Sequence, residues 1–485
     1  MKRVLIVCNR LAPAIELDYV AGSLSESHKL APVVLLSSAE LESKLPAGAL
    51  AGVERRMLTK LIRRPFGMNK GRALNFAAKV ARALRLEAAA DFLLVWRAIA
   101  MGEVAMERLL REFDITVVVV ADDRSLGFEY GIVCAAARRS LPSIAVPFAL
   151  SDPDADWIRR SERPIFDVDR GFVFSRWLKW WLVHRFPENV REQNGRRLMF
   201  LTSGQVLGTH AFGRDFPAAW AYGGGATDFA AVFDEAILRK QTSLGVSPAK
   251  LVLTGQCSLD SLYRLSLDRV KRRRELDDRL GLDPSAPLII CAAPQYGEHG
   301  MMNHSRHLRL SGELFQQLRS SAGNVVLSLH PRSRPTDYLD AASQVGAVIS
   351  PLPLVNILAA ADLFVATHSS TVRWAILLGI PVIILDDFGV GAAGMFDTDG
   401  IRLLSERSSL GREAGLLLHD LASRTAAIEG LERQQRKMGL FDGQSGERLL
   451  AFFENITTKD NVEVGGAIAR PSAGQSKSFS DRHKL

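Results

Sequence analysis

The sequence predicts an α/β protein with two domains, each built on a parallel β-sheet with helices on both faces. Its 485 residues are more than one hydrophobic core usually accommodates. Short apolar, β-branched runs alternate with longer helical patterns, which is typical of parallel sheets. The alternation pauses once, across a charged segment at 262–286, and then resumes. We therefore expect two Rossmann-like domains that face a common cleft.

The expected strands of the first half are six apolar runs, and those of the second half are five. They lie at 4–8, 33–37, 115–120, 143–147, 198–202 and 250–255, and then at 288–293, 325–330, 347–350, 363–368 and 382–387. Helical patterns separate them, at 73–86, 100–112, 126–139, 311–320, 337–345, 353–361 and 370–379. The predicted organisation is an N-terminal domain, a linker, a C-terminal domain whose last helix crosses back, and a polar tail without periodicity that we expect to be disordered. Their bounds are 1–262, 263–286, 287–457 and 458–485.

Composition argues for a cytoplasmic protein. No apolar run approaches the 18 or so residues of a membrane-spanning helix, and the N-terminal apolar run is too short for a secretory signal. The four cysteines are scattered without a CxxC pair, so we expect buried, reduced thiols.

The net charge of +8 indicates an anionic partner. Two stretches are basic, 55–72 and 176–197, and the second carries Trp177, Trp180 and Trp181. Tryptophan and cationic side chains together favour a membrane interface, here the inner face of the cytoplasmic membrane; the alternative is a helix whose tryptophans pack into the core. The run KRRR at 271–274 is followed at once by acidic residues, which favours a solvated linker helix over a nucleic-acid site.

A first chemical signal is LSLHPRSRP at 327–335. A predicted strand ends at His330, and Pro331 and Arg332 follow in the loop at its carboxyl end. Ligands of parallel sheets bind outside the carboxyl ends of the strands, and histidine and arginine donate hydrogen bonds to phosphate oxygens. His-Pro after a strand is a weak motif on its own.

A second signal is the run Ser369-Ser370-Thr371, which separates a predicted strand from a predicted helix. Hydroxyls and free backbone N–H groups at a helix N-terminus form an anion site. The alternative for a single serine is a simple N-cap. Because both signals follow strands of the same sheet, together they favour a phosphate site.

The C-terminal half resembles a superfamily of GT-B enzymes that includes bacterial sialyltransferases, capsule transferases, CDP-glycerol glycerophosphotransferases and non-hydrolysing UDP-N-acetylglucosamine 2-epimerases. The resemblance covers roughly residues 220 to 457. It rests on His330-Pro331, on Ser369-Ser370 and on three further segments. These are GVSPAKLVLTGQCSLDSLY (245–263, with Thr254, Gly255 and Asp260), LGIPVI (378–383) and FDGQSGERLLAFF (441–453).

The resemblance implies that His330, Ser369 and Ser370 hold the phosphate of a nucleotide-linked donor. The chain departs from the epimerases and from retaining transferases, because Val372, Arg373 and Trp374 stand where those families carry a glutamate pair. We therefore expect inversion at the donor carbon. The scheme requires no metal and no cofactor beyond the donor substrate, and Gln295 and His299 are expected in the donor loop.

An inverting transferase needs a base to deprotonate the acceptor hydroxyl. Asp122 and Asp123 follow a buried strand at its carboxyl end and are the candidates; the alternative is that one of them caps the next helix. Glu16 and Asp18 are weaker candidates.

The predicted function is transfer of a sugar from a CMP-, CDP- or UDP-linked donor to a bacterial surface polysaccharide or glycolipid. Three alternatives remain open: a 2-epimerase-like isomerase, a CDP-glycerol-type glycerophosphotransferase, and a non-catalytic nucleotide-sugar-binding protein.

Overall fold

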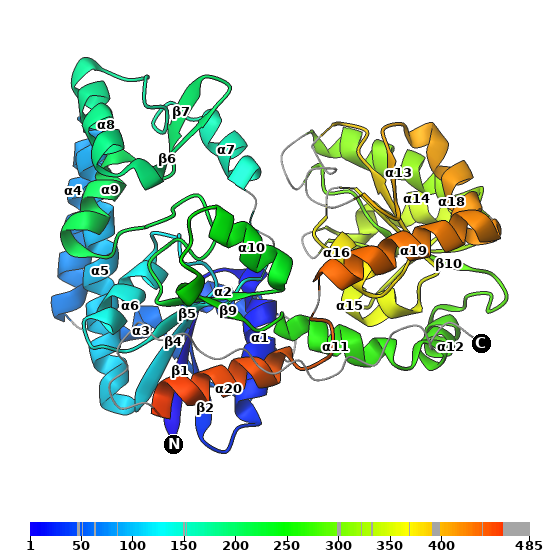
Figure 1. Ribbon diagram of the computed structural model, residues 1–485, viewed down its shortest axis with the longest axis horizontal. Helices are drawn as coiled ribbons and strands as arrows, with labels where there is room; N and C mark the ends of the chain where they lie inside the picture. Colours follow the sequence, from blue (N-terminus) through cyan, green and yellow to red (C-terminus); the bar gives the residue numbers. More distant parts are fainter. Residues whose placement is uncertain are drawn as a thin grey trace.

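The computed structural model describes two α/β domains, which we call the N domain and the C domain (Figure 1). The described residues are 1–45, 49–50, 52–62, 65–84, 86–148, 151, 153–297, 302–321, 323–330, 333–367, 369–389, 398–438 and 440–458. Almost all of the tail predicted to be disordered, from residue 459 onward, lies outside them.

The N domain contains a parallel sheet of seven strands in the order β3-β2-β1-β4-β5-β8-β9. The strands are β1 (Lys2–Cys8), β2 (Leu30–Leu36), β3 (Glu54–Met57), β4 (Ile115–Val120), β5 (Ser143–Ala145), β8 (Phe229–Val232) and β9 (Leu251–Leu253). The strand order reverses between β1 and β4, and such a reversal opens a crevice at the carboxyl ends of the two strands.

One predicted strand does not belong to the parallel sheet. The run at 198–202 was expected in the parallel sheet, but β7 (Arg196–Met199) pairs antiparallel with β6 (Val190–Gln193) in a separate hairpin. Asn194 and Gly195 form its two-residue turn, with φ of 52° and 71°, as an Asn-Gly hairpin requires. The parallel sheet instead contains β3 and β8, which the sequence analysis did not predict.

The helices of the N domain pack around its sheet and on one another. They are α1 (Leu11–Ser25), α2 (Ala39–Ser43), α3 (Leu58–Leu61), α4 (Pro65–Ala83), α5 (Glu87–Glu112), α6 (Phe128–Ala137), α7 (Pro153–Ser161), α8 (Val173–Arg185), α9 (Ser203–Phe212), α10 (Glu235–Ser243) and α11 (Cys257–Ser266). Helices α5 and α6 cross so closely that a Cβ on Gly131 would lie 1.9 Å from the carbonyl oxygen of Ala98. Glycine is therefore required at this crossing, which fixes α6 and the loop before it.

The C domain repeats the plan with a parallel six-stranded sheet in the order β12-β11-β10-β13-β14-β15. Its strands are β10 (Leu288–Ala292), β11 (Asn324–Ser328), β12 (Val348–Ile349), β13 (Leu363–Ala366), β14 (Val382–Leu385) and β15 (Ile401–Leu404). Its helices are α12 (Arg269–Leu280), α13 (His304–Arg319), α14 (Leu339–Val345), α15 (Leu354–Ile357), α16 (Val372–Leu377), α18 (Leu410–His419) and α19 (Leu421–Met438). The order reverses between β10 and β13, so the crevice of this domain lies at their carboxyl ends.

The last helix, α20 (Ser445–Thr458), crosses back and packs on the N domain (Figure 1). Leu449, Phe452 and Phe453 join the core beneath β1 and β4. The carboxylate of Asp260 accepts hydrogen bonds from the backbone N–H groups of Ser445 and Gly446, at 2.9 and 2.7 Å. Two of the segments that carry the family resemblance therefore bind each other and hold this crossing in place.

The basic run at 271–274 lies in α12, which packs on the C domain through Leu276. Arg273 forms ion pairs with Asp277 and Asp362, at 2.8 and 2.9 Å. Part of this positive charge is therefore neutralised inside the protein.

All four cysteines are buried and unpaired, as the sequence analysis predicts. Within the described part of the chain, no helix is both long enough and apolar enough to span a bilayer.

Candidate functional site

The carboxyl edges of the two sheets meet. Arg373, in the first turn of α16, forms an ion pair with Asp234, which follows β8; the Nη2–Oδ2 distance is 2.6 Å. The two side chains are 7% and 1% exposed, so the pair is buried between the domains. Asp234 also caps α10 by accepting from the backbone N–H of Ile237 at 2.7 Å. This contact fixes which edges face each other.

We call the loops after β10, β11 and β13 the C edge (residues 293–297, 329–330, 367 and 369–371). Gln295, His330 and Ser369 lie in these three loops and are partly exposed. Because β11 and β13 flank β10, their ends are two strand spacings apart, roughly 10 Å. A diphosphate with its nucleoside can extend over that distance.

Ser369 and Thr371 are arranged as a local turn. Their hydroxyls lie 2.7 Å apart, and the N–H of Thr371 donates to Ser369 Oγ at 3.3 Å. Ser370 is exposed. Helix α16 is shorter than the predicted 370–379 and spans only Val372–Leu377. A phosphate site here would therefore depend more on the hydroxyl groups than on the dipole of this short helix. Three further predicted residues, Pro331, Arg332 and His299, lie outside the described residues.

The loop after β10 is braced from its neighbours. The hydroxyl of Tyr296 donates to Asp387 Oδ1, which follows β14, at 2.9 Å, and Asp387 pairs with Arg407. Burial, with the nearby Asp387 carboxylate, raises the pKa of Tyr296 well above its ordinary value, so the phenol stays a neutral donor. This brace fixes the position of Gln295.

We call the loops after β1 and β4 the N edge (residues 9–10 and 121–127). Asp123 in this edge is fully buried, and its partners are structural. Its carboxylate accepts from the N–H groups of Gly223 and Gly225, at 3.2 and 2.6 Å, and pairs with Lys250 at 3.4 Å. A Cβ on Gly225 would lie 2.0 Å from the carbonyl oxygen of Asp123. These contacts give the Asp123 carboxylate a structural role.

Asp122 is partly exposed, and its carboxylate is held by local contacts. It accepts from the N–H of Arg124 at 3.0 Å and lies 3.8 Å from the guanidinium of Arg10. The weaker candidates are structural as well. Glu16 accepts from Gln256 and from the N–H of Ser258, and Asp18 accepts from the N–H of Leu50.

The structure adds a carboxylate that the sequence analysis missed. Glu129, in the first turn of α6, is 1% exposed, and its carboxylate oxygens have no well-aligned hydrogen-bond partner among the described residues; the side chain of Asn9 gives them only a weak hydrogen bond. It lies at the reversal between β1 and β4, near Asn9, Arg10 and Asp122. Burial raises its pKa to about 7; the charge of Arg10 and the hydrogen bond from Asn9 partly offset this rise, and the charge of Asp122 reinforces it. A carboxylate with a pKa near neutrality suits proton transfer.

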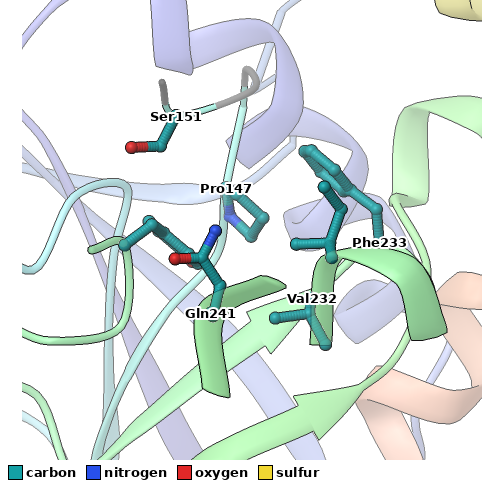
Figure 2. A pocket seen from close by; sticks show the side chains of 7 residues that line it. Pro147, Ser151, Val232, Phe233 and Gln241 are labelled. Atoms are coloured by element: carbon teal, nitrogen blue, oxygen red, sulfur yellow. The ribbon is translucent and has the colours of Figure 1, made fainter. Parts of the chain in front are cut away.

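A small pocket lies beside the N edge, at the carboxyl ends of β5 and β8 (Figure 2). Its lining is mostly apolar, with Pro147, Val232 and Phe233 among the contributors. The polar groups in the wall are Ser151, whose hydroxyl lies 3.0 Å from Arg124 Nη2, and Gln241, whose Oε1 lacks a hydrogen-bond partner among the described residues.

A metal site is not apparent in the part of the chain that the structure describes, since it contains no cluster of three or more His, Cys, Asp or Glu side chains suited to hold an ion. His307, which the sequence places near His304, is buried in α13 with Nε2 2.7 Å from the hydroxyl of Tyr338.

Two Rossmann-like domains that face each other through their carboxyl edges, with a last helix that crosses back, define a GT-B-like fold. No family model and no curated protein matches the sequence. Solved structures match over almost the whole chain. The UDP-GlcNAc 2-epimerase from Neisseria meningitidis, bound to UDP-GlcNAc, has a TM-score of 0.52 at 14% identity and covers 94% of this chain and 100% of its own.

Two further structures support the same fold. A second UDP-N-acetylglucosamine 2-epimerase has a TM-score of 0.51 at 14% identity, with 96% and 99% of the two chains covered. A variant of the wall teichoic acid polymerase TagF has a TM-score of 0.51 at 10% identity, with 94% and 89% covered. At these identities the likeness establishes the fold alone.

Proposed function

We propose that this protein is an inverting glycosyltransferase that moves a sugar from a nucleotide-linked donor to a hydroxyl of a surface polysaccharide or glycolipid. The observation that carries the proposal is Glu129. A buried carboxylate that receives only a weak hydrogen bond, here from Asn9, is costly, and Glu129 lies beside the carboxyl ends of β1 and β4, in the domain that faces the C edge. A hydroxyl that enters this crevice gives Glu129 a further donor.

In the proposed reaction the donor phosphate lies along the C edge. His330, Ser369 and Ser370 donate hydrogen bonds to it, which stabilises the charge that develops as the nucleotide departs. The acceptor oxygen forms the new bond to the anomeric carbon while the bond to the phosphate oxygen breaks. Glu129 takes the acceptor proton and afterwards releases it to solvent.

The arrangement supports a transferase over an isomerase because of Arg373. The Arg373 side chain forms the buried ion pair with Asp234, and no glutamate pair is present in the first turn of α16. A carboxylate on the N edge and phosphate-binding groups on the C edge suit a reaction between two molecules, one held by each domain.

The test is turnover of CMP-, CDP- and UDP-linked sugars with and without a lipid-linked glycan fraction, with products identified by mass spectrometry. We expect free nucleotide and a glycosylated acceptor only when both substrates are present. E129Q should lower turnover by roughly 10²–10⁴-fold while nucleotide binding persists. E103Q, on a surface carboxylate paired with Arg138 and Arg139, is the matched control and should retain activity.

Other outcomes identify the alternatives. Conversion of a UDP-sugar without any acceptor would indicate an isomerase, and transfer of glycerol phosphate from CDP-glycerol would indicate a glycerophosphotransferase. Nucleotide binding without turnover against any acceptor would indicate a binding protein.

A further inference from the structure

The outward face of α8 is apolar. Three consecutive residues at its start, Phe172, Val173 and Phe174, are 73%, 75% and 72% exposed. Trp177 and Trp180 follow on the same face and are 57% and 53% exposed. The rings of Phe174 and Trp177 stack with centroids 5.9 Å apart. The tryptophans therefore do not pack into the core, which decides between the two interpretations of this stretch.

The orientation of α8 is fixed from its inner side. Leu182 is buried in the core, and Lys179 is 3% exposed. The amino group of Lys179 donates to the carbonyl oxygens of Asp167 and Arg170, at 2.7 and 2.9 Å. A rotation that buried the tryptophans would expose Leu182 and break these bonds. The aromatic face is therefore presented to the outside by the fold.

The charged side chains of α8 itself have one sign, although Asp167, Asp169 and Glu87 lie near its Lys179. No acidic residue lies between Arg170 and Phe186, while Arg176 and Arg185 are exposed. In the part of the chain that the structure describes, neither arginine forms an ion pair with a carboxylate. An apolar face bordered by unpaired cations complements a surface that is both apolar and anionic.

A second helix adds to the same side of the N domain. In α4, Phe76 and Val80 are 70% and 41% exposed, and Lys79 and Arg82 are exposed beside them. Helix α4 packs on α5, α5 on α9, and α9 on α8. Figure 1 shows α4 and α8 along the edge of the N domain that is farthest from the C domain.

We propose that the outer face of α8, extended by α4, docks on the surface of an anionic lipid bilayer. Indole rings and aliphatic side chains enter the headgroup layer while arginine and lysine bind lipid phosphates. A second copy of the chain is a poorer occupant, because a two-fold contact would bring like charges together. Docking here leaves the C domain, on the far side of the N domain, away from the bilayer (Figure 1).

The test is co-sedimentation of the full chain with vesicles of phosphatidylcholine alone or with 30% phosphatidylglycerol (a fraction on the order of a natural anionic leaflet). We expect binding to the anionic vesicles that weakens as salt increases. W177A/W180A and R176E/R185E should each lower the affinity by roughly tenfold or more. R274E/R279E, on exposed positions of α12 in the C domain, is the matched control and should bind as the native protein does.

Because the changed side chains are exposed, each variant should keep its melting temperature, and that is measured first. Equal binding to neutral and anionic vesicles, or binding unaffected by both α8 variants, would overturn the proposal. So would a dimer in sedimentation without vesicles that W177A/W180A abolishes, since the face would then belong to a second copy. None of these readouts depends on glycosyl transfer.

Discussion

Replacing Glu129 with glutamine should stabilise the protein above neutral pH while removing its activity. The pKa of Glu129 rises from its ordinary 4.5 to about 7 because the side chain is buried. Between pH 4.5 and about pH 7, Glu129 is therefore mostly protonated in the folded state and mostly ionised in the unfolded state. Stability falls as the pH rises through this window and stays lower above it. The rise corresponds to about 3 kcal/mol, at about 1.4 kcal/mol per pH unit. Glutamine does not titrate and avoids this loss.

The assay is urea unfolding of native protein and E129Q between pH 4 and pH 8, followed by tryptophan fluorescence. Every tryptophan except Trp374 lies in the N domain, so the signal reports mainly on that domain. The free-energy difference between variant and native protein should grow by about 3 kcal/mol in favour of E129Q across the range.

E103Q is the control of opposite sign. Burial alone would raise the pKa of Glu103, but bonds from Arg139 and Arg138 outweigh it and lower the pKa. E103Q should therefore gain no stability at pH 8. If E129Q gains none either, Glu129 is not a strained buried carboxylate, and the argument for its role in proton transfer fails.

Three further predictions concern the structure around the site. R373A should destabilise the protein by about 3–5 kcal/mol, because it leaves the Asp234 carboxylate buried without its partner. In urea unfolding, R373M/D234N should recover most of this loss of stability. An equal loss in both variants would contradict the buried pair. G225A should cost about 1–3 kcal/mol, because the new methyl group meets the backbone of Asp123; an unchanged unfolding midpoint would contradict this close approach. A thiol reagent such as DTNB at pH 8 should leave the native protein unmodified for minutes and modify all four cysteines in urea. Burial raises the pKa of Cys8 and Cys291 to about 12, so rapid reaction of the native protein would show that the thiols are accessible.

The strands that carry the site were predictable because they are strongly apolar. β13 is a continuous buried run, and β4 is buried at every position except Thr116; both lie between helical patterns, so the positions of Asp122 and Ser369 after them followed from the sequence. Strand β8 was not predictable in the same way. Its sequence, FAAV, contains two alanines that carry little strand signal, and it is recruited by pairing with β5 and β9. Asp234, which follows β8, was missed with it.

The burial of Glu129 and of Arg373 was not foreseen for a different reason. Each lies in the first turn of a helix, where a charged side chain is ordinarily exposed. Nothing local in FEYG or VRWA shows that these turns are buried, because burial depends on α5 crossing α6 and on the approach of the other domain. Conversely, the Asp123 carboxylate accepts a hydrogen bond from the backbone N–H of Gly223, a hundred positions away, and no local pattern indicates this contact.

The central claim is that a donor nucleotide binds at the C edge, and the most direct measurement is thermal stabilisation by CMP, CDP, UDP and GDP of the native protein and of His330→Ala. A ligand at 100 times its Kd stabilises the folded state by about 2.7 kcal/mol. We predict that one of these nucleotides raises the melting temperature of the native protein and that His330→Ala loses this response. A native protein that responds to none of the four, or a variant that responds as the native protein does, would contradict the claim.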